Sequence, residues 1–351
     1  MKKLEEIDKN LAVETEIQRE GLTFYNIEQA PFRLHGIFKE NDLFRRIPDE
    51  VASRVSEGVR ELNGRPAGGR VRFVTDSPYV AIKAKCVPYR MSHHALSGSC
   101  GFDMYIEYDE ENRYAGTFIP PRDMKREYES VIDFEVDGEK VVTINFPLYS
   151  MVNEVLVGIK EGAVLKEAPD YKFSVPVVYY GSSITQGGCA SKPGGTYQSI
   201  LSRRFECDYI NLGFSGSAKG EDVIREYIQG MDMSVFVLDY DHNAPTVEHL
   251  AATHSKMFDA VRVTHPDIPI VIMPRPKYYL TEEEKQRHDV VYQTYKTAKD
   301  KGDQNVYFIS GRKLMELAGD NGTIDNCHPT DSGFLSMAYA VGEVFKEIFC
   351  M

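Results

Sequence analysis

The sequence predicts an α/β protein of two domains, in which an all-β sandwich precedes a domain with a central parallel sheet. The chain has 351 residues, enough for about two domains of ordinary size. Short segments rich in β-forming residues and separated by turn signals fill residues 68–165, whereas strand-like runs alternate with helical stretches after about residue 170. We therefore assign residues 1–170 to the β domain and residues 171–351 to the α/β domain.

The predicted sandwich consists of short strands joined by tight turns. Asp76-Ser77-Pro78 and Asp137-Gly138 are typical turn sequences, and the segments around them alternate apolar and polar residues. Many half-buried strands of this kind favour a β-sandwich. The first 60 residues yield no regular element, because proline and glycine interrupt any long helix or strand there, at Pro31, Gly36 and Pro48.

The second domain shows strand and helix in strict alternation. Apolar runs predict strands at 175–180, 208–214, 234–240, 268–273 and 305–309. Helical stretches between and after them cover 196–205, 220–230, 247–264, 281–300 and 331–349. Alternation of this kind predicts βαβ units, and hence a parallel sheet with helices on both faces.

Charge and apolar content exclude several classes of protein. The formal net charge is −12, from 41 basic and 53 acidic residues, so a polyanion such as nucleic acid would be repelled. No stretch approaches the roughly 20 apolar residues of a membrane span, and the N-terminus lacks the apolar core of a secretion signal. Six cysteines without a CxxC pair are typical of reduced thiols. We expect a cytoplasmic protein without a nucleic-acid or membrane partner.

The segment VVYYGSSITQGG at residues 177–188 ends the first predicted parallel strand in a glycine- and serine-rich loop. It matches neither the phosphate-binding GxxxxGK pattern nor GxGxxG, and Thr185 replaces the second glycine of a GxSxG elbow. Ser183 nevertheless lies at the carboxyl edge of the sheet, where a following helix offers N–H donors to a developing negative charge. The alternative interpretation is a serine that only caps that helix.

A nucleophilic serine needs a base and a carboxylate that orients it, and IDNCHPTDSGF near the C-terminus contains both. Asp325 precedes His328 by three residues, so a single turn can place the carboxylate against the imidazole. The alternative is a loop that merely caps the last helix. A metal site is not expected, because two ligands without a matching cluster do not complete one.

Two further strand ends offer donors for an oxyanion, the negatively charged oxygen formed during acyl transfer. NLGFSGSAKG follows the second strand, where Gly216 can present a backbone N–H, and LDYDHNAPT follows the third, where Asn243 can present an amide. Four separate strand ends thus each carry a residue type that acyl transfer requires.

The blocks GSSIT, NLGFSG, DYDHNAP and DNCHP occur in this order over about 150 residues, and together they resemble the SGNH (GDSL-like) hydrolases. The resemblance implies a flavodoxin-like fold, Ser183 as nucleophile, and Asp325 with His328 as the rest of a catalytic triad. It also implies an oxyanion hole formed by the Ser183 amide, Gly216 and Asn243. The chain departs from the family pattern at Ser182, where the GDS motif has Asp, and in the third block, which lacks the GxND form.

The first half resembles the N-terminal jelly-roll domain named for its GxDLY signature, through FRRIP, PAGGRVRFVTDSP and GFDMY. The combination is similar to carbohydrate esterases that remove acetyl groups from plant polysaccharides, including xylan and mannan. We therefore expect a serine esterase that acts on acetylated oligosaccharides and needs no cofactor or metal. A thioesterase or acyltransferase with the same triad remains an alternative, as does a carbohydrate-binding protein without activity.

Three further residues are candidate substrate contacts. His93 lies in the loop PYRMSHHALSGSC, and Arg275 and Tyr278 lie in PRPKYY after the fourth strand. For His93 and the adjacent His94 the alternatives are a metal ligand and a plain loop residue, and for PRPKYY the alternative is a loop shaped by its prolines. His242 is expected to shape the loop of Asn243. A homodimer is expected, because it is the commonest soluble oligomer.

Overall fold

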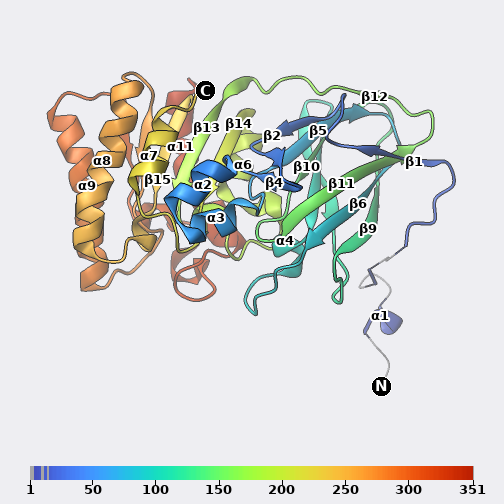
Figure 1. Cartoon of the computed structure of the whole chain (residues 1–351), viewed down its shortest axis with the longest axis horizontal. Coiled ribbons are helices and arrows are strands. Elements are labelled where there is room, and N and C mark those ends of the chain that lie inside the picture. The colour runs from blue at the N-terminus through green and yellow to red at the C-terminus, as the bar shows by residue number, and fades with distance from the viewer. Residues whose placement is uncertain (1–3, 9–11, 14–15, 351) are drawn as a thin grey trace.

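The computed structural model describes residues 4–8, 12–13 and 16–350. Figure 1 shows two domains side by side, a helix-rich one at one end and a β-rich one at the other. The predicted boundary at residue 170 falls in the segment between strand β12 (Leu165–Lys166) and strand β13 (Phe173–Gly181). A short helix, α1 (Leu4–Ile7), lies at the N-terminal end and away from both domains (Figure 1).

The N-terminal domain is a sandwich of two antiparallel sheets. One sheet has the strand order β1-β11-β6-β9, and the other has β12-β5-β10-β7-β8 with β2 added to β5. The strands are β1 (Leu22–Asn26), β2 (Arg33–His35), β5 (Arg70–Thr75), β6 (Tyr79–Val87), β7 (Phe102–Tyr108), β8 (Glu111–Phe118), β9 (Glu127–Asp133), β10 (Lys140–Asn145) and β11 (Met151–Lys160). Their inward residues form one apolar core that includes Phe73, Ile82 and Val142.

The second domain is built on five parallel strands in the order β14-β13-β15-β16-β17. The strands beside β13 are β14 (Cys207–Gly213), β15 (Val235–Asp239), β16 (Ile270–Ile272) and β17 (Val306–Phe308). The order places the first strand of the domain next to the second and third, which is the flavodoxin-like arrangement. The predicted fold class, an α/β domain with a central parallel sheet after an all-β sandwich, is confirmed.

Helices cover both faces of the parallel sheet. One face packs against α6 (Tyr197–Phe205), α10 (Gly311–Leu314) and α11 (Asp331–Ile348), through a core that contains Val177, Leu201 and Phe334. The other packs against α7 (Asp222–Gln229), α8 (Val247–Thr264) and α9 (Glu282–Asp300). Short turns of helix lie in the connections, namely α4 (Leu96–Ser99), α5 (Ser183–Gln186), η2 (Pro193–Gly195), η3 (Asp241–Asn243) and η4 (Gly319–Gly322).

Two helices from the N-terminal part of the chain pack against the parallel sheet of the second domain. After the hairpin β3 (Phe38–Glu40) and β4 (Leu43–Arg45), helices α2 (Asp49–Val55) and α3 (Glu57–Asn63) pack into the core on the α7 face (Figure 1). Each has only seven residues, and Ser56 ends the first and caps the second. Elements this short leave no clear periodicity, which is why the sequence did not predict them.

Arg46 ties this N-terminal segment to the carboxyl end of β14. Its buried guanidinium donates to the carbonyl oxygens of Asn211 and Leu62, at 3.2 and 2.8 Å, and lies 4.4 Å from the centre of the Phe214 ring. Side-chain donors that cap strand-end carbonyls satisfy groups that would be costly to leave buried without partners. The loop after β14 is therefore held from outside the second domain.

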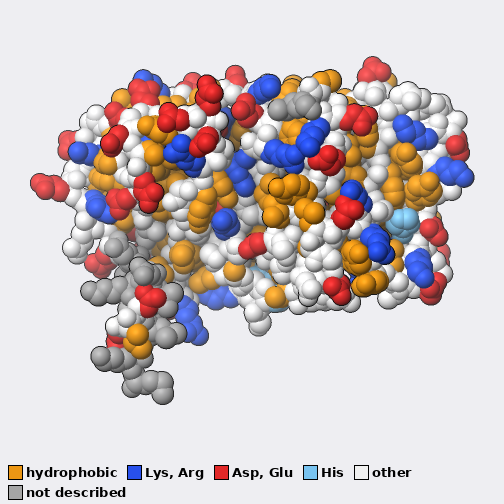
Figure 2. All heavy atoms as spheres, turned by 180° about the vertical axis from the view of Figure 1, so that it is seen from behind, with side chains coloured by type: hydrophobic (Ala, Val, Ile, Leu, Met, Phe, Trp, Pro, Cys, Tyr) orange, Lys and Arg blue, Asp and Glu red, His pale blue; other side chains and the backbone are white. Residues whose placement is uncertain are grey.

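The surface carries charges of both signs. On the face in Figure 2, acidic and basic side chains are interspersed over both domains. No helix within the described ranges is long and apolar enough to cross a membrane. All six cysteines are free thiols, as predicted.

Candidate active site

A sharp turn places Ser183 at the carboxyl end of β13. Gly181 ends the strand where a side chain would collide with the Asp239 carbonyl oxygen, 2.2 Å from the position of an added Cβ. Ser182 then caps helix α5, because its Oγ accepts a hydrogen bond from the Ile184 amide at 3.2 Å. The capping role thus falls to Ser182, and the Ser183 hydroxyl is left for another partner.

That partner is His328, and the two residues form a chain of hydrogen bonds with Asp325. Ser183 Oγ lies 2.8 Å from His328 Nε2, and His328 Nδ1 lies 2.7 Å from Asp325 Oδ2. The second carboxylate oxygen, Oδ1, accepts from the amides of His328 and Cys327 at 2.7 and 3.1 Å. Asn326 adopts a positive φ of 64°, which closes the tight turn between the acid and the base.

The charge of Asp325 determines the roles of the two imidazole nitrogens. Partial burial alone would raise the pKa of Asp325, but its hydrogen bonds with the amide and ring of His328 outweigh burial and lower that pKa. Because the carboxylate is ionised and can only accept, Nδ1 of His328 carries the proton. The lone pair of Nε2 therefore faces Ser183, as general-base chemistry requires.

The three predicted oxyanion donors lie at the ends of the neighbouring strands β13, β14 and β15. Gly216 sits in the turn after β14 with φ of 66°, and a side chain at its Cα would meet open space. Asn243 Nδ2 donates to the Phe214 carbonyl at 2.9 Å, which leaves its second N–H free to point elsewhere. Among the described residues the amides of Ser183 and Gly216 donate to no protein group. This edge therefore has the unused donors that an oxyanion hole needs.

Gln186 supports this edge and was missed in the sequence. Its Oε1 accepts from the Ser215 amide at 3.0 Å, and its Nε2 donates to the Leu148 carbonyl at 3.1 Å. The side chain thereby joins the Ser183 helix, the Gly216 turn and a loop of the sandwich. Gln186 is one of several polar residues in the segment GSSITQGG, and nothing in the sequence identifies its partners.

The loop of Asn243 is held by two arginines. Arg275 donates from Nε to Asp241 at 3.1 Å and from Nη1 to Glu284 at 3.1 Å. Arg287 donates to the carbonyls of Asp241 and Ala244 at 3.0 and 2.9 Å. Arg275, predicted as a substrate contact, is thus occupied by two carboxylates and positions η3.

Tyr278 and His242 are similarly engaged with protein groups. The Tyr278 hydroxyl accepts from Arg312 at 3.1 Å, and that guanidinium lies 4.4 Å from the centre of the ring. His242 Nδ1 lies 3.8 Å from Cys327 Sγ, so it links the Asn243 loop to the Asp325 loop. Burial lowers the pKa of His242 to about 4, even though the charge of Asp241 opposes this. His242 is therefore neutral near pH 7.

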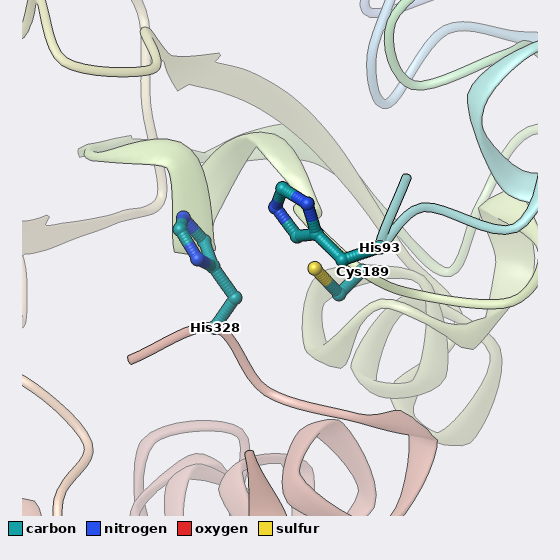
Figure 3. A group of neighbouring side chains, drawn as sticks. All are labelled: His93, Cys189 and His328. Carbon is teal, nitrogen blue, oxygen red and sulfur yellow. The ribbon is translucent and has the colours of Figure 1, made fainter. Parts of the chain in front are cut away.

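The sandwich domain contributes one wall of the site. His93, a predicted substrate contact, lies with its ring centre 6.0 Å from that of His328 (Figure 3). His94 packs edge-on against Tyr149 at 4.6 Å, and the Tyr149 hydroxyl donates to the Ser183 carbonyl at 3.4 Å. Burial, with the nearby His93 and His328, lowers the pKa of His94 to about 4. Tyr149 was missed, because no local pattern indicates where the other domain lies.

Clusters of metal-binding atoms also occur at this edge. The ligand atoms of His93, Cys189 and His328 lie within 4.8 Å of one another, as do those of Asp325, Cys327 and His328. No sequence pattern joins the members of the first cluster, because they are far apart in the chain.

A flavodoxin-like sheet with a serine, a histidine and an aspartate joined at its carboxyl edge has the architecture of a serine hydrolase. Residues 174–346 match the GDSL-like Lipase/Acylhydrolase family, and residues 22–165 match the domain described as the N-terminus of Esterase_SGNH_hydro-type. Residues 174–346 therefore form a GDSL-like lipase/acylhydrolase domain, and a GxDLY N-terminal domain precedes it, as the resemblance implied.

Solved structures share the fold of both domains. A GDSL-like protein from Bacteroides ovatus ATCC 8483 is 27% identical, with a TM-score of 0.84 over 93% of this chain and 98% of its own. The salicylyl-acyltransferase SsfX3 from a tetracycline biosynthetic pathway is 19% identical, with a TM-score of 0.75 over 95% and 99%. The acetyl xylan esterase Est2A from the rumen bacterium Butyrivibrio proteoclasticus is 13% identical, with a TM-score of 0.58 over 93% and 98%. No curated protein matches the sequence.

Proposed function

We propose that this protein is a serine esterase that removes O-acetyl groups from carbohydrates, with plant-derived oligosaccharides such as acetylated mannan or xylan fragments as substrates. The observation that carries the proposal is the unbroken chain of hydrogen bonds from Ser183 through His328 to Asp325. An ionised acid, a base with a free lone pair and a hydroxyl in contact with it are the parts that acyl transfer requires.

In the first half of the reaction, Ser183 Oγ attacks the acetyl carbonyl carbon while His328 Nε2 takes its proton. The oxygen that becomes negative is stabilised by the amides of Ser183 and Gly216 and by the Asn243 side chain. His328 then gives the proton to the departing sugar oxygen, which leaves an acetyl group on Ser183. The charge of Asp325 stabilises the imidazolium that forms in between.

In the second half, His328 takes a proton from water as the water oxygen attacks the acetyl-serine. The same three donors stabilise the new oxyanion. Acetate leaves as the proton returns from His328 to Ser183, so the enzyme is restored without a cofactor. Apart from the substrate and water, every group in the cycle belongs to this chain.

Support for a carbohydrate substrate comes from the sandwich wall and from the fold. His93 is exposed beside His328, where its ring can exchange hydrogen bonds with sugar hydroxyls. Tyr89 is partly exposed and stacks on Tyr149, which offers apolar ring surface at the rim of the site. The acetyl xylan esterase Est2A shares the two-domain fold. We propose His93 as the substrate contact and assign Arg275 a positioning role.

The decisive experiment measures acetate released from acetylated manno- and xylo-oligosaccharides by the protein, by Ser183→Ala and by Ser182→Ala. Ser182→Ala is the matched control, because it removes the same hydroxyl one residue away and costs only a helix cap. We expect Ser183→Ala to reduce kcat by about 10⁴- to 10⁶-fold. Equal rates for Ser183→Ala and the unmodified protein would exclude this nucleophile.

A second candidate, acyl transfer to an acceptor other than water, is favoured by the likeness to SsfX3 over both domains. The triad is the same in both reactions, so the products must decide. Free oligosaccharide is added to the acetyl-enzyme in water at a series of concentrations. The amount of acetate released is then compared with the amount of newly acetylated sugar. Acetylated sugar as the main product at millimolar acceptor would replace the hydrolase assignment with a transferase. Sugar binding without turnover of any ester would indicate a binding protein.

A further inference from the structure

His93, Cys189 and His328 surround one space beside the candidate nucleophile. Figure 3 shows the two imidazole rings and the thiol directed toward this space from three separate segments. His93 comes from the loop between β6 and α4, Cys189 from the loop after α5, and His328 from the loop before α11. Their ligand atoms all lie within 4.8 Å of one another.

Two of these three side chains have no hydrogen-bond partner within the described part of the protein. Within the described part of the chain, neither the His93 ring nor the Cys189 thiol takes part in a hydrogen bond, and both are accessible to solvent to some degree. Cys189 has a positive φ of 74°, which is uncommon for a residue with a side chain and follows a left-handed Gly187. Backbone held in such a region at a site is a recognised sign of a functional constraint.

Two imidazoles and a thiolate form a donor set typical of zinc. Metal–nitrogen bonds of about 2.1 Å and metal–sulfur bonds of about 2.3 Å require donors roughly 3.5 Å apart in a tetrahedron. The ligand atoms of the observed cluster lie within 4.8 Å of one another, so rotation of the His93 and Cys189 side chains is needed to close the site around an ion. The fourth position stays open to water, as in sites with three protein ligands.

His328 can offer the ion only one of its nitrogens. Nδ1 donates its proton to Asp325, so the single lone pair is on Nε2, which accepts from Ser183. A cation bound there must displace the serine hydroxyl from the imidazole. Metal binding and general-base catalysis therefore exclude each other at the same atom.

We propose that His93, Cys189 and His328 form a binding site for a thiophilic divalent cation, best matched by Zn²⁺, and that the bound ion holds the enzyme inactive. On binding, the Cys189 S–H bond breaks, its proton goes to solvent, and a metal–sulfur bond forms beside two metal–nitrogen bonds. The metal site follows from the geometry alone, whereas the inhibition rests on the proposed esterase function.

The second cluster, Asp325 with Cys327 and His328, is the competing location. Its carboxylate already accepts three hydrogen bonds, and its thiol lies against His242 at 3.8 Å. A metal ion bound to this second cluster would break the hydrogen bonds between Asp325 and His328 that orient the imidazole. Cys327→Ser therefore serves as the matched control for Cys189→Ser, because the two changes are identical and test different clusters.

The first measurement is spectroscopic and needs no substrate. The metal-free protein is titrated with Co²⁺, which takes the place of zinc and absorbs strongly in the near ultraviolet when a thiolate binds it. We expect this absorption in the unmodified protein and in Cys327→Ser, and its loss in Cys189→Ser. No thiolate absorption in the unmodified protein, or its loss in Cys327→Ser alone, would overturn the site.

The second measurement tests the inhibition with p-nitrophenyl acetate and Zn²⁺. We expect Zn²⁺ to abolish turnover, a chelator to restore it, and Cys189→Ser to need at least tenfold more Zn²⁺ for half inhibition relative to its own uninhibited rate. Turnover that Zn²⁺ leaves unchanged or increases would refute the inhibitory role. If no ester is hydrolysed at all, the proposed function fails, and the Co²⁺ titration still decides the metal site.

Discussion

The hydrolase domain supplies charged and hydrogen-bonding groups to the candidate active site, whereas the sandwich domain supplies aromatic surface. On the hydrolase side, the loops of Asp325 and Asn243 are held by carboxylates, arginines and backbone amides. On the sandwich side, His93, His94 and Tyr149 are held mainly by ring contacts. Changes on the first side should therefore alter the chemical step, and changes on the second should alter substrate binding.

The largest effect is expected at the acid of the triad. Asp325→Asn keeps the shape but can donate to His328, which favours the wrong tautomer, so kcat for p-nitrophenyl acetate should fall by about 10⁴-fold. Asp320→Asn, an exposed position in the same connection, is the control and should behave like the unmodified protein. A loss smaller than tenfold in Asp325→Asn would show that this carboxylate does not orient the base.

A smaller effect on the same side is expected at the oxyanion donor. Asn243→Ala removes an N–H aimed at charge that develops only in the transition state, so kcat should fall by roughly 10²- to 10³-fold with little change in KM. Circular dichroism checks that loss of the bond to Phe214 leaves the fold intact. A rise in KM at constant kcat would instead assign Asn243 to ground-state binding.

Acid should destabilise the part of the hydrolase domain that holds the Asn243 loop, through protonation of Glu284. Burial raises the pKa of this carboxyl, but hydrogen bonds from Lys277 and the Thr281 amide, with the charges of Lys277 and Arg275, prevail and lower it to about 2 from an ordinary 4.5. Because the folded pKa is the lower one, the stabilisation is complete above about pH 4.5 and is lost as the pH falls toward 2.

Glu284→Gln tests this pH dependence. The variant should lower the free energy of unfolding by about 1–2 kcal/mol at pH 7, and the difference should shrink at pH 3, as measured by urea unfolding. Glu282→Gln, which changes an exposed carboxylate in the same helix turn, is the control. A difference that is the same at both pH values would show that the charge of Glu284 contributes nothing.

The smallest effect is expected on the sandwich side. His93→Ala removes one hydrogen-bonding group from the proposed sugar contact, so KM for acetylated oligosaccharides should rise about 3- to 10-fold. The rate with p-nitrophenyl acetate, which has no sugar, should change less. An equal fall in kcat for both substrates would place His93 in the chemical step. It would also remove the contrast between the hydrolase side and the sandwich side of the site.

Local patterns predicted the regular elements of the hydrolase domain closely. Helix α8 was expected at 247–264 and runs from Val247 to Thr264, because Thr246 caps it and apolar residues recur along one face. Helices α2 and α3 were not predicted, because each has only seven residues and neither shows such a repeat. The predicted homodimer and the role of each site residue stay predictions.

Connectivity explains why part of the site could be predicted from the sequence. Parallel strands bring their carboxyl ends to one edge, so a serine after the first strand and a histidine after the last were expected to meet. The observed contact between Ser183 and His328 agrees with that expectation. Arg275 lies at the same edge, yet its direction depends on Asp241 and Glu284, which no strand rule specifies.

The sequence by itself determined the class of fold and the short turn from Asp325 to His328. It also determined the order in which the reactive residues at the strand ends follow one another along the chain. These depend on periodicity and on spacing within a few residues, which are local properties. Only the tertiary structure decided that His93 and Tyr149 reach the edge of the hydrolase sheet and that Cys189 faces His328. The physical reason is that docking of two domains is set by the packing of surfaces far apart in the chain, and no local pattern records which surfaces meet.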